Sequence, residues 1–442
     1  MQKNERSRRA EARHVPHHED GVASRPLLVH ATRVLGMVLT FEHPADAVLS
    51  RYFRENREIG HRDRGFIAEC VYGIVRRLAW VKRLAGADAQ PRAYLLAWLA
   101  RGEGWPMRQF EGLVSATEME WISVLKASEP TAESLGDRTD LPDWLVFRLL
   151  ESRSEDELIA LAHGLNRSAP LDIRVNVLKA SREEVLEGLA AGGFKAEPCP
   201  LSPHGIRFAG KPALQKHPLF LEGVIEVQDE GSQLLGFLTQ PRRGELVVDF
   251  CAGAGGKTLH LGALMRSTGR LYAFDVSEKR LAKLKPRVAR SGLSNVHPIL
   301  VAHERDAKIK RLAGKADRVL VDAPCSGLGT LRRNPDLKWR QTPASVAEMV
   351  AKQAAILASA ARLVRPGGRL VYATCSLLAE ENDGIVGAFL NAHPEFVEID
   401  ASEILHKQNI ELNTGKRLRL TPHEHDTDGF FAAVVERRVD GV

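Results

Sequence analysis

The sequence predicts an α/β protein in three parts: an all-helical N-terminal domain, a small α+β module, and a mostly parallel sheet that ends in an antiparallel hairpin. Between residues 25 and 150 the apolar positions recur at helical spacing, with almost no alternating runs. From residue 241 onward, apolar strands alternate with helical stretches, which is typical of a parallel sheet covered by helices on both faces. The stretch 416–437 holds two β candidates without a helix between them, which predicts the hairpin.

The N-terminal part begins with residues 1–24, which have mixed charge and few apolar side chains, so we expect a disordered tail. The helical domain follows over residues 25–150. Its clearest apolar face comprises Phe66, Ile67, Cys70, Val71, Ile74, Val75 and Leu78.

Residues 155–240 have a different pattern and predict the small α+β module. A short strand at 172–178 precedes an amphipathic helix at 181–194, and further β candidates follow at 205–210 and 224–229.

Residues 241–442 hold the predicted parallel sheet. Helices are expected at 278–292 and 344–364 between its strands. The expected strands are LVVDF (246–250), RLYAFD (270–275), VHPILVA (296–302), DRVLVDAP (317–324) and GRLVYATCS (368–376).

The composition limits the classes of protein to which this chain can belong. The 442 residues are 44% hydrophobic and 27% charged, so most of the chain should fold, and a net charge of +6 permits a nucleic-acid partner without requiring one. No apolar run is long enough for a membrane span and no signal peptide is present, so a cytoplasmic protein is expected. The five cysteines form no CxxC pair, so we expect free thiols and no metal.

A glycine-rich loop follows the first strand of the predicted sheet. Gly253, Gly255 and Gly256 lie where a doubly wound sheet needs a tight turn and close approach of a nucleoside or an anion. A phosphate-binding P-loop is excluded because Cys251 stands where its first glycine must be. A dinucleotide fingerprint fits only halfway because Thr258 replaces its last glycine, so a single nucleoside is expected.

Two charged residues near this loop have alternative interpretations. Asp275 ends the next strand, where a carboxylate can accept both ribose hydroxyls; alternatively it caps the helix that begins near Ser277. Lys257 either contacts substrate or is a solvated lysine in the first helical turn.

Two cysteines follow two strands of the predicted sheet. Cys325 comes shortly after Asp322, and Cys375 stands directly after another apolar strand. Since the carboxyl ends of parallel strands meet at one edge, both thiols should converge on the ligand crevice. The alternative is two inert thiols that reach this edge by chance.

Several motifs together carry a resemblance to a known family. VVDFCAGAGGKT, VDAPCSGLGTLRRNPDLKW, YATCSLLAEEN and TDGFFAAVV are similar to those of the RsmB/Fmu (Sun) family of RNA cytosine-5 methyltransferases. LDIRVNVLK and VIEVQDEGSQL resemble the small module that precedes the catalytic domain there, so the resemblance covers about 155–437. The helical region resembles the NusB-like RNA-binding domain of some members. The resemblance implies a class I Rossmann-like methyltransferase domain.

The resemblance also implies roles for particular residues. Cys375 would attack C6 of the cytosine and Cys325 would assist release of the adduct, with Asp322 and Lys257 completing the catalytic set. An acidic residue near the adenine is expected after the third strand, where Glu304 and Asp306 remain open. The S-adenosylmethionine site would comprise Cys251, Ala252, Gly253, Ala254, Gly255, Gly256, Lys257, Asp275, Arg280, Glu304 and Asp322.

The chemistry of cytosine explains why a thiol is needed. C5 is a poor nucleophile, but a thiolate that adds to C6 converts the ring into an enamine that can accept a methyl group. Asp322 is the expected partner of the N3 and N4 edge of the base.

The expected partner is RNA. Arg332, Arg333, Lys338 and Arg340 should hold its phosphates, unless they belong to an ordinary solvated loop. The target base must be unpaired or leave its stack. We expect a monomer that acts on 16S ribosomal RNA; the alternatives are transfer RNA and a non-catalytic RNA-binding or ribosome assembly factor.

Overall fold

The computed structural model describes residues 24–128 and 134–439. The chain divides into two compact units, Met1–Thr131 and Ala132–Val442. The tail expected over residues 1–24 lies outside the described residues except for Ser24. None of the described helices combines the length and the apolarity that crossing a membrane would require.

The first unit confirms the all-helical prediction. Among its described residues, no strand is present. The predicted apolar face is largely buried, including Ile67, Val71, Ile74 and Leu78. Its elements are α2 (Arg25–Val38), α3 (Ala45–Glu55), α4 (His61–Arg76), α5 (Leu78–Ala85), α6 (Pro91–Ala97), a π-helical turn (Trp98–Gly102), a 3₁₀ turn (Met107–Phe110) and α7 (Ala116–Ala127).

Three short helices open the second unit: α8 (Leu135–Thr139), α9 (Asp143–Leu150) and α10 (Glu155–Leu165). Their leucines pack in one cluster with leucines of two loops further along the chain, among them Leu328 and Leu377. The structure therefore divides the chain at residues 131 and 132 rather than near 150, because these helices bury their apolar faces on the second unit.

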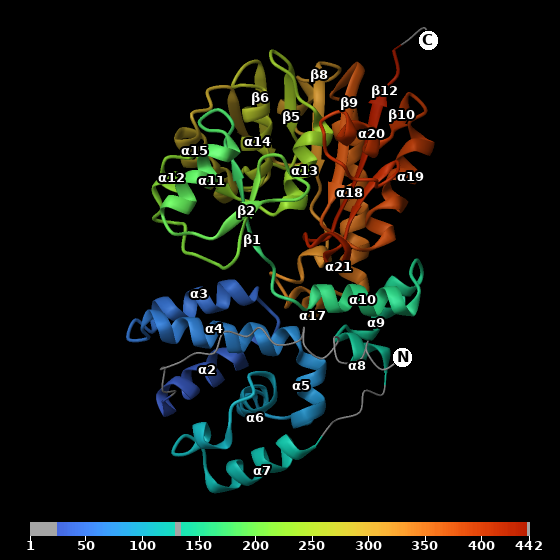
Figure 1. Ribbon diagram of the computed structural model, residues 1–442. Helices are drawn as coiled ribbons and strands as arrows, with labels where there is room; N and C mark the ends of the chain where they lie inside the picture. Colours follow the sequence, from blue (N-terminus) through green and yellow to red (C-terminus); the bar gives the residue numbers. More distant parts are fainter. Residues whose placement is uncertain (1–23, 129–133, 440–442) are drawn as a thin grey trace, which may run out of the picture. The chain divides into compact units, whose positions relative to one another are not determined.

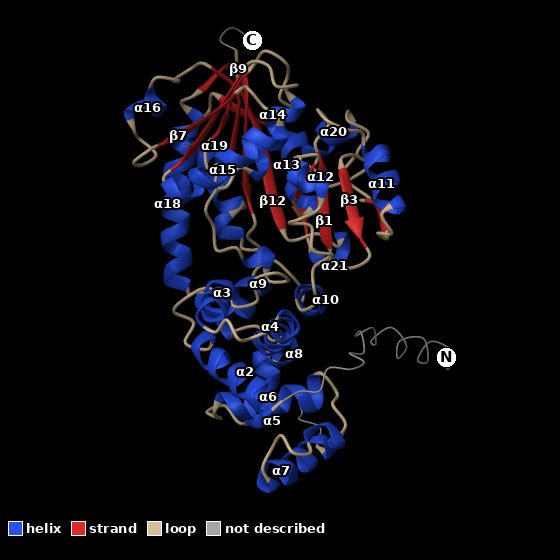
Figure 2. Ribbon diagram, turned by 90° about the vertical axis from the view of Figure 1, so that its left-hand side faces the viewer, coloured by secondary structure: helices blue, strands red, loops and turns tan. Residues whose placement is uncertain are grey.

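The small module is an antiparallel sheet of four strands in the order β2-β3-β1-β4. Figure 2 shows β1 and β3 with α11 and α12 beside them. Ser181 begins α11 through a capping box with Glu184. The elements are β1 (Leu171–Val175), α11 (Arg182–Ala191), β2 (Ala196–Pro198), β3 (Gly205–Phe208), α12 (Pro218–Leu221) and β4 (Ile225–Val227); β2 is a short edge strand that the sequence pattern did not indicate.

The large sheet has the strand order β10-β12-β9-β8-β5-β6-β7, with β11 also paired to β12 (Figure 1). Pairs among β5 to β9 are parallel, whereas β12 is antiparallel to β9, β10 and β11, which confirms the predicted fold class. The strands are β5 (Leu246–Asp249), β6 (Arg270–Asp275), β7 (Val296–Leu300), β8 (Ala316–Asp322), β9 (Val364–Thr374), β10 (Phe396–Ile399), β11 (Arg417–Leu420) and β12 (Phe430–Arg437).

Helices cover both faces of this sheet. Successive residues of β5 point to opposite faces, so Val247 belongs to one apolar cluster and Val248 to the other. The first cluster holds α13 (Glu230–Thr239), α14 (Gly256–Leu264) and α20 (Ala401–His406); the second holds α16 (Ala307–Lys310), α18 (Pro343–Ala361) and α19 (Asp383–Ala392). Additional helices are α15 (Glu278–Ser291), α17 (Leu337–Arg340) and α21 (Pro422–His425).

The strand order gives the large sheet a switch point near its centre. From β5 the chain proceeds to β6 and β7 on one side and returns to β8 and β9 on the other. A doubly wound sheet binds ligands at such a switch point, outside the carboxyl ends of the strands. The loops that follow β5 and β8 meet there.

Candidate active site

The two cysteines meet at this edge. Because Asp322 of β8 lies in register with Ala373 of β9, the loops after the two strands are neighbours. The Sγ atoms of Cys325 and Cys375 lie 3.4 Å apart, and both residues are half-buried free thiols. The hydrogen bond with Cys375 and burial raise the pKa of Cys325 well above its usual range. The convergence predicted from the sequence is therefore present in the structure.

An ion pair lies beside the thiols. Lys257 Nζ is 2.6 Å from Asp322 Oδ2 and 5.7 Å from the centre of the Phe430 ring. Burial lowers the pKa of Lys257, but the charges of Asp322 and of the Cys375 thiol outweigh burial and raise it. Lys257 is therefore a largely buried cation close to both Asp322 and Cys375, rather than a solvated lysine.

The glycine loop is held by Asp275. The carboxylate accepts a hydrogen bond from Gly253 N–H at 2.8 Å through Oδ2 and from Ser277 N–H at 2.7 Å through Oδ1. The N-cap of α15 is Ser277 itself, so Asp275 supports the turn before the helix and is not its cap. Arg280, mostly exposed, lies 3.9 Å from Asp275.

The backbone of the loop requires glycine at two positions. Gly253 and Gly255 have φ values of 57° and 89°, in the left-handed region that favours glycine. A Cβ at Gly255 would lie 2.1 Å from Leu284. The backbone N–H groups at the start of α14, which begins at Gly256, are suited to a carboxylate or phosphate.

The two acidic residues after β7 differ in their surroundings. Asp306 is the N-cap of α16, and its carboxylate accepts from Lys308 N–H at 2.8 Å and from Ala302 N–H at 2.9 Å. These backbone bonds lower the pKa of Asp306. Glu304 instead pairs only loosely with the neighbouring Arg305, at 3.6 Å. Of the two carboxylates, only that of Asp306 is engaged in capping a helix.

The basic loop after Cys325 is not the exposed surface that the sequence predicts. The Arg332 side chain is fully buried and pairs with Asp426 at 2.7 Å. Arg333 pairs with Asp428 at 2.7 Å and with Asp229 at 2.9 Å.

Two further predicted phosphate ligands also have internal partners. Lys338 is buried and donates to Asn166 Oδ1 at 3.2 Å, while Arg340 pairs with Asp336 at 3.4 Å. The expectation of solvent-facing phosphate ligands is therefore corrected for Arg332 and Lys338, which are buried, whereas Arg333 and Arg340 are partly exposed and their contact with RNA stays a prediction.

Sequence reasoning missed the residues by which the small module holds the glycine loop. Arg174 on β1 donates to the carbonyl of Gly256 at 2.8 Å, and Arg287 on α15 donates to that of Ala254 at 2.6 Å. Glu226 on β4 pairs with Arg287 at 2.8 Å. Burial lowers the pKa of Arg174 to about 9. An arginine inside a predicted strand was the available signal.

A group of potential metal ligands lies in the small module. Ligand atoms of Asp172, Cys199 and Glu230 all lie within 4.8 Å of one another. Arg207 pairs with Asp172 at 2.7 Å and with Glu230 at 3.5 Å. Since the guanidinium already neutralises these carboxylates, the group is an internal ion-pair cluster.

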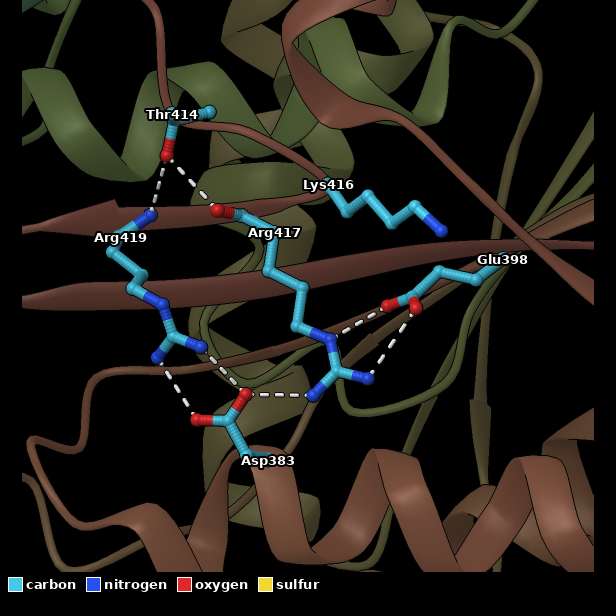
Figure 3. A pocket seen from close by; sticks show the side chains of 6 residues that line it. All are labelled: Asp383, Glu398, Thr414, Lys416, Arg417 and Arg419. Atoms are coloured by element: carbon cyan, nitrogen blue, oxygen red, sulfur yellow. Dashed lines mark hydrogen bonds and ion pairs between the residues drawn. The ribbon is translucent and has the colours of Figure 1, made fainter. Parts of the chain in front are cut away.

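A shallow polar pocket of about 310 Å³ lies over β11 (Figure 3). Arg417 donates to Asp383 and Glu398, both at 2.6 Å, and Arg419 donates to Asp383 at 2.6 Å. Arg419 lies in register with Phe431, which lies opposite Thr374. The pocket is thus two strands from Cys375, and most of its charged lining residues form ion pairs with one another.

Comparisons with known proteins agree with this geometry. Residues 237–436 match the family model described as 16S rRNA methyltransferase RsmB/F, and residues 141–215 match the ferredoxin-like domain of the RsmF/B-like methyltransferases. The chain is 37% identical over 305 residues to a probable ribosomal RNA small subunit methyltransferase B of Synechocystis, covering 69% of this chain and 68% of the relative.

Two further proteins are similar over most of their length. A protein of Bacillus subtilis with the same description is 32% identical over 336 residues, which are 74% of this chain and 73% of the relative. The crystal structure of a methyltransferase homolog protein from Pyrococcus horikoshii is 28% identical with a TM-score of 0.60, covering 71% of this chain and 100% of the other.

Proposed function

Because the chain belongs to the RsmB/F family of ribosomal RNA methyltransferases, we propose that it methylates C5 of a cytosine in 16S ribosomal RNA through a covalent bond between Cys375 and C6. The observation that carries the proposal is the pair of thiols 3.4 Å apart beside the ion pair of Lys257 and Asp322. A reaction without covalent catalysis has no need for two facing cysteines.

The cofactor of this family is S-adenosylmethionine, and the loop after β5 fits it. Gly253 and Gly255 have positive φ values that give the loop a tight turn, and the first turn of α14 offers backbone N–H groups for the methionine carboxylate. Asp275 would accept the ribose hydroxyls and Glu304 would lie near the adenine, since Asp306 already caps α16. When bound, S-adenosylmethionine supplies the methyl group as an electrophile.

The residues of the chain carry out the remaining steps. The Cys375 thiolate, close to the Lys257 cation, forms a bond to C6, and the ring electrons make C5 nucleophilic. Asp322 holds the N3 and N4 edge of the base. After C5 has accepted the methyl group, its proton leaves to a base. The electrons of the C6–S bond then return to the Cys375 sulfur, beside Cys325.

Two substitutions test the roles of the thiols. Cys375→Ala should abolish both methyl transfer and the covalent protein–RNA adduct, whereas Cys325→Ala should accumulate that adduct as a slow band on a denaturing gel. Cys70→Ala, a change to a buried thiol of the first unit, is the control and should leave turnover unchanged. Reversed outcomes for Cys375 and Cys325 would exchange their roles.

The identity of the RNA is tested in cells. Bisulfite sequencing of RNA from a deletion strain and its parent should show one cytosine of 16S ribosomal RNA that loses its protection in the deletion strain. Loss of protection in a transfer RNA instead would overturn the choice of substrate but not the chemistry. The helical first unit, as a NusB-like domain, would dock the RNA so that an unpaired cytosine reaches Cys375.

A further inference from the structure

Glu381 is a fully buried carboxylate that lies beneath both cysteine loops. Its Oε1 accepts hydrogen bonds from the backbone N–H of Ser326 at 2.8 Å and from Nε2 of Gln353 at 2.9 Å. Its Oε2 accepts from the hydroxyl of Ser326 at 2.5 Å and from the hydroxyl of Ser376. Four donors from three separate segments thus converge on one side chain.

These contacts control the residues that follow the two thiols. Ser326 comes directly after Cys325 and Ser376 directly after Cys375, and their hydroxyl oxygens lie 3.2 Å apart. A single carboxylate therefore sets the relative position of the two loops. Without it, the hydroxyls of Ser326 and Ser376 and the backbone N–H of Ser326 would lose this acceptor, which is costly in the protein interior.

The next residue, Asn382, holds the Cys375 loop from both sides of the thiol. Its Oδ1 accepts from the Thr374 hydroxyl at 2.6 Å, and its Nδ2 donates to the Ser376 carbonyl at 3.0 Å. Together, Glu381 and Asn382 hold the backbone before and after Cys375 and the backbone directly after Cys325.

The charge of Glu381 also distinguishes the two thiols. Cys375 is the thiol near the Lys257 cation, whereas Cys325 is the one near Glu381. The hydrogen bond with Cys375, burial and then the negative charges of Cys375 and Glu381 raise the pKa of Cys325. The raised pKa favours the protonated form of Cys325.

We propose that Glu381 is a positioning residue that aligns the two cysteines, so that Cys325 donates a hydrogen bond to the departing sulfur of Cys375. The inference rests on the proposed function. During release, the C5 proton leaves to a base, its electron pair forms the C5–C6 double bond, and the electrons of the C6–S bond return to Cys375. The hydrogen bond from Cys325, at the present Sγ–Sγ distance of 3.4 Å, stabilises that thiolate.

The test compares Glu381→Gln with Glu380→Gln. Glu380 is the adjacent glutamate, but its side chain faces Arg148 at 3.9 Å and is partly exposed, so it is a matched control. Glu381→Gln should slow release more than adduct formation, giving about tenfold more adduct at steady state and about tenfold lower kcat. Glu380→Gln should behave like the wild type.

A pH profile separates positioning from a purely structural role. Removal of the negative charge lowers the pKa of Cys325, so the alkaline limb of the release rate should shift to lower pH in Glu381→Gln. The inference is overturned if the alkaline limb of the release rate stays at the wild-type pH. It is also overturned if Glu381→Gln slows adduct formation and release equally.

Further variants distinguish failure of this inference from failure of the proposed function. If Glu381→Gln does not fold, Ser326→Ala removes one of the four donors and should still accumulate adduct; an adduct level equal to that of the wild type would refute the proposal. If Cys325→Ala forms no adduct, the proposed function itself fails. If Cys325→Ala forms adduct and Glu381→Gln does not, only the role of Glu381 is lost.

Discussion

Gly329 and Gly429 cross so closely that neither has room for a side chain. Gly429 N–H donates to the Gly329 carbonyl at 2.8 Å, and Gly329 N–H donates to the Cys375 carbonyl, also at 2.8 Å. The two glycines thereby join the loops that carry the two cysteines to the turn before β12. The active-site backbone depends on this crossing.

Gly329→Ala should therefore damage both stability and activity. The new Cβ would lie 2.2 Å from the Gly429 carbonyl oxygen and 2.8 Å from that of Cys375, and both neighbours are backbone. We expect a loss of about 1–3 kcal/mol in the free energy of unfolding, measured in urea, together with loss of methyl transfer. Gly387→Ala in α19, where nothing lies within 4 Å, should be neutral or slightly stabilising. Wild-type turnover in Gly329→Ala would contradict this account.

Lys257 and Asp322 should act as one unit. Lys257→Met and Asp322→Asn should each lower kcat/KM by about 100-fold, because each leaves its partner with an unbalanced charge beside Cys375. The double variant should be at least as active as the less active of the two single variants, as measured by transfer of a labelled methyl group. Additive losses would show that the two residues act independently. Arg318 and Glu245, a pair at the opposite end of β8, provide the control.

Asp249 should make stability depend on pH. Burial raises the pKa of Asp249 to about 7, above the usual carboxyl range, even though Thr258 donates to it at 2.6 Å. The folded state thus binds this proton more tightly than the unfolded state, so the contribution of Asp249 to the free energy of unfolding falls as pH rises toward 7.

Asp249→Asn should remove this loss of stability at higher pH. The variant should gain stability relative to the wild type at pH 8 but not at pH 5, as measured by urea denaturation at both values. An equal difference between variant and wild type at the two pH values would show that Asp249 does not titrate in this range.

Arg332 should matter for folding rather than for RNA binding. Its buried side chain pairs with Asp426 and lies 3.6 Å from the buried Asp428, so Arg332→Ala should cost about 3 kcal/mol in the free energy of unfolding. The salt dependence of RNA binding by the remaining folded protein should not change. Arg305→Ala, a mostly exposed control, should leave stability unchanged. A smaller salt slope in Arg332→Ala would restore the role in phosphate binding.

Much of the fold and of the candidate site could be predicted from local pattern. Apolar strands that alternate with helical stretches predicted the five parallel strands, and the rule that ligands bind at the carboxyl ends of such strands predicted that Cys325 and Cys375 converge. The sequence pattern did not indicate β10, nor β2, whose alanine, glutamate and proline are all depleted in strands. Local pattern determines where a strand ends and therefore which edge a residue occupies.

Only the tertiary structure decided which polar groups pair. Arg332 belongs to a basic loop in the sequence, yet packing places it against Asp426, 94 residues away. Glu381 is one of two adjacent glutamates, and only its burial beneath Ser326 and Ser376 distinguishes it from Glu380. The physical reason is that hydrophobic periodicity is local, whereas the desolvation of a charge and the partners that compensate it depend on segments brought together from distant parts of the chain.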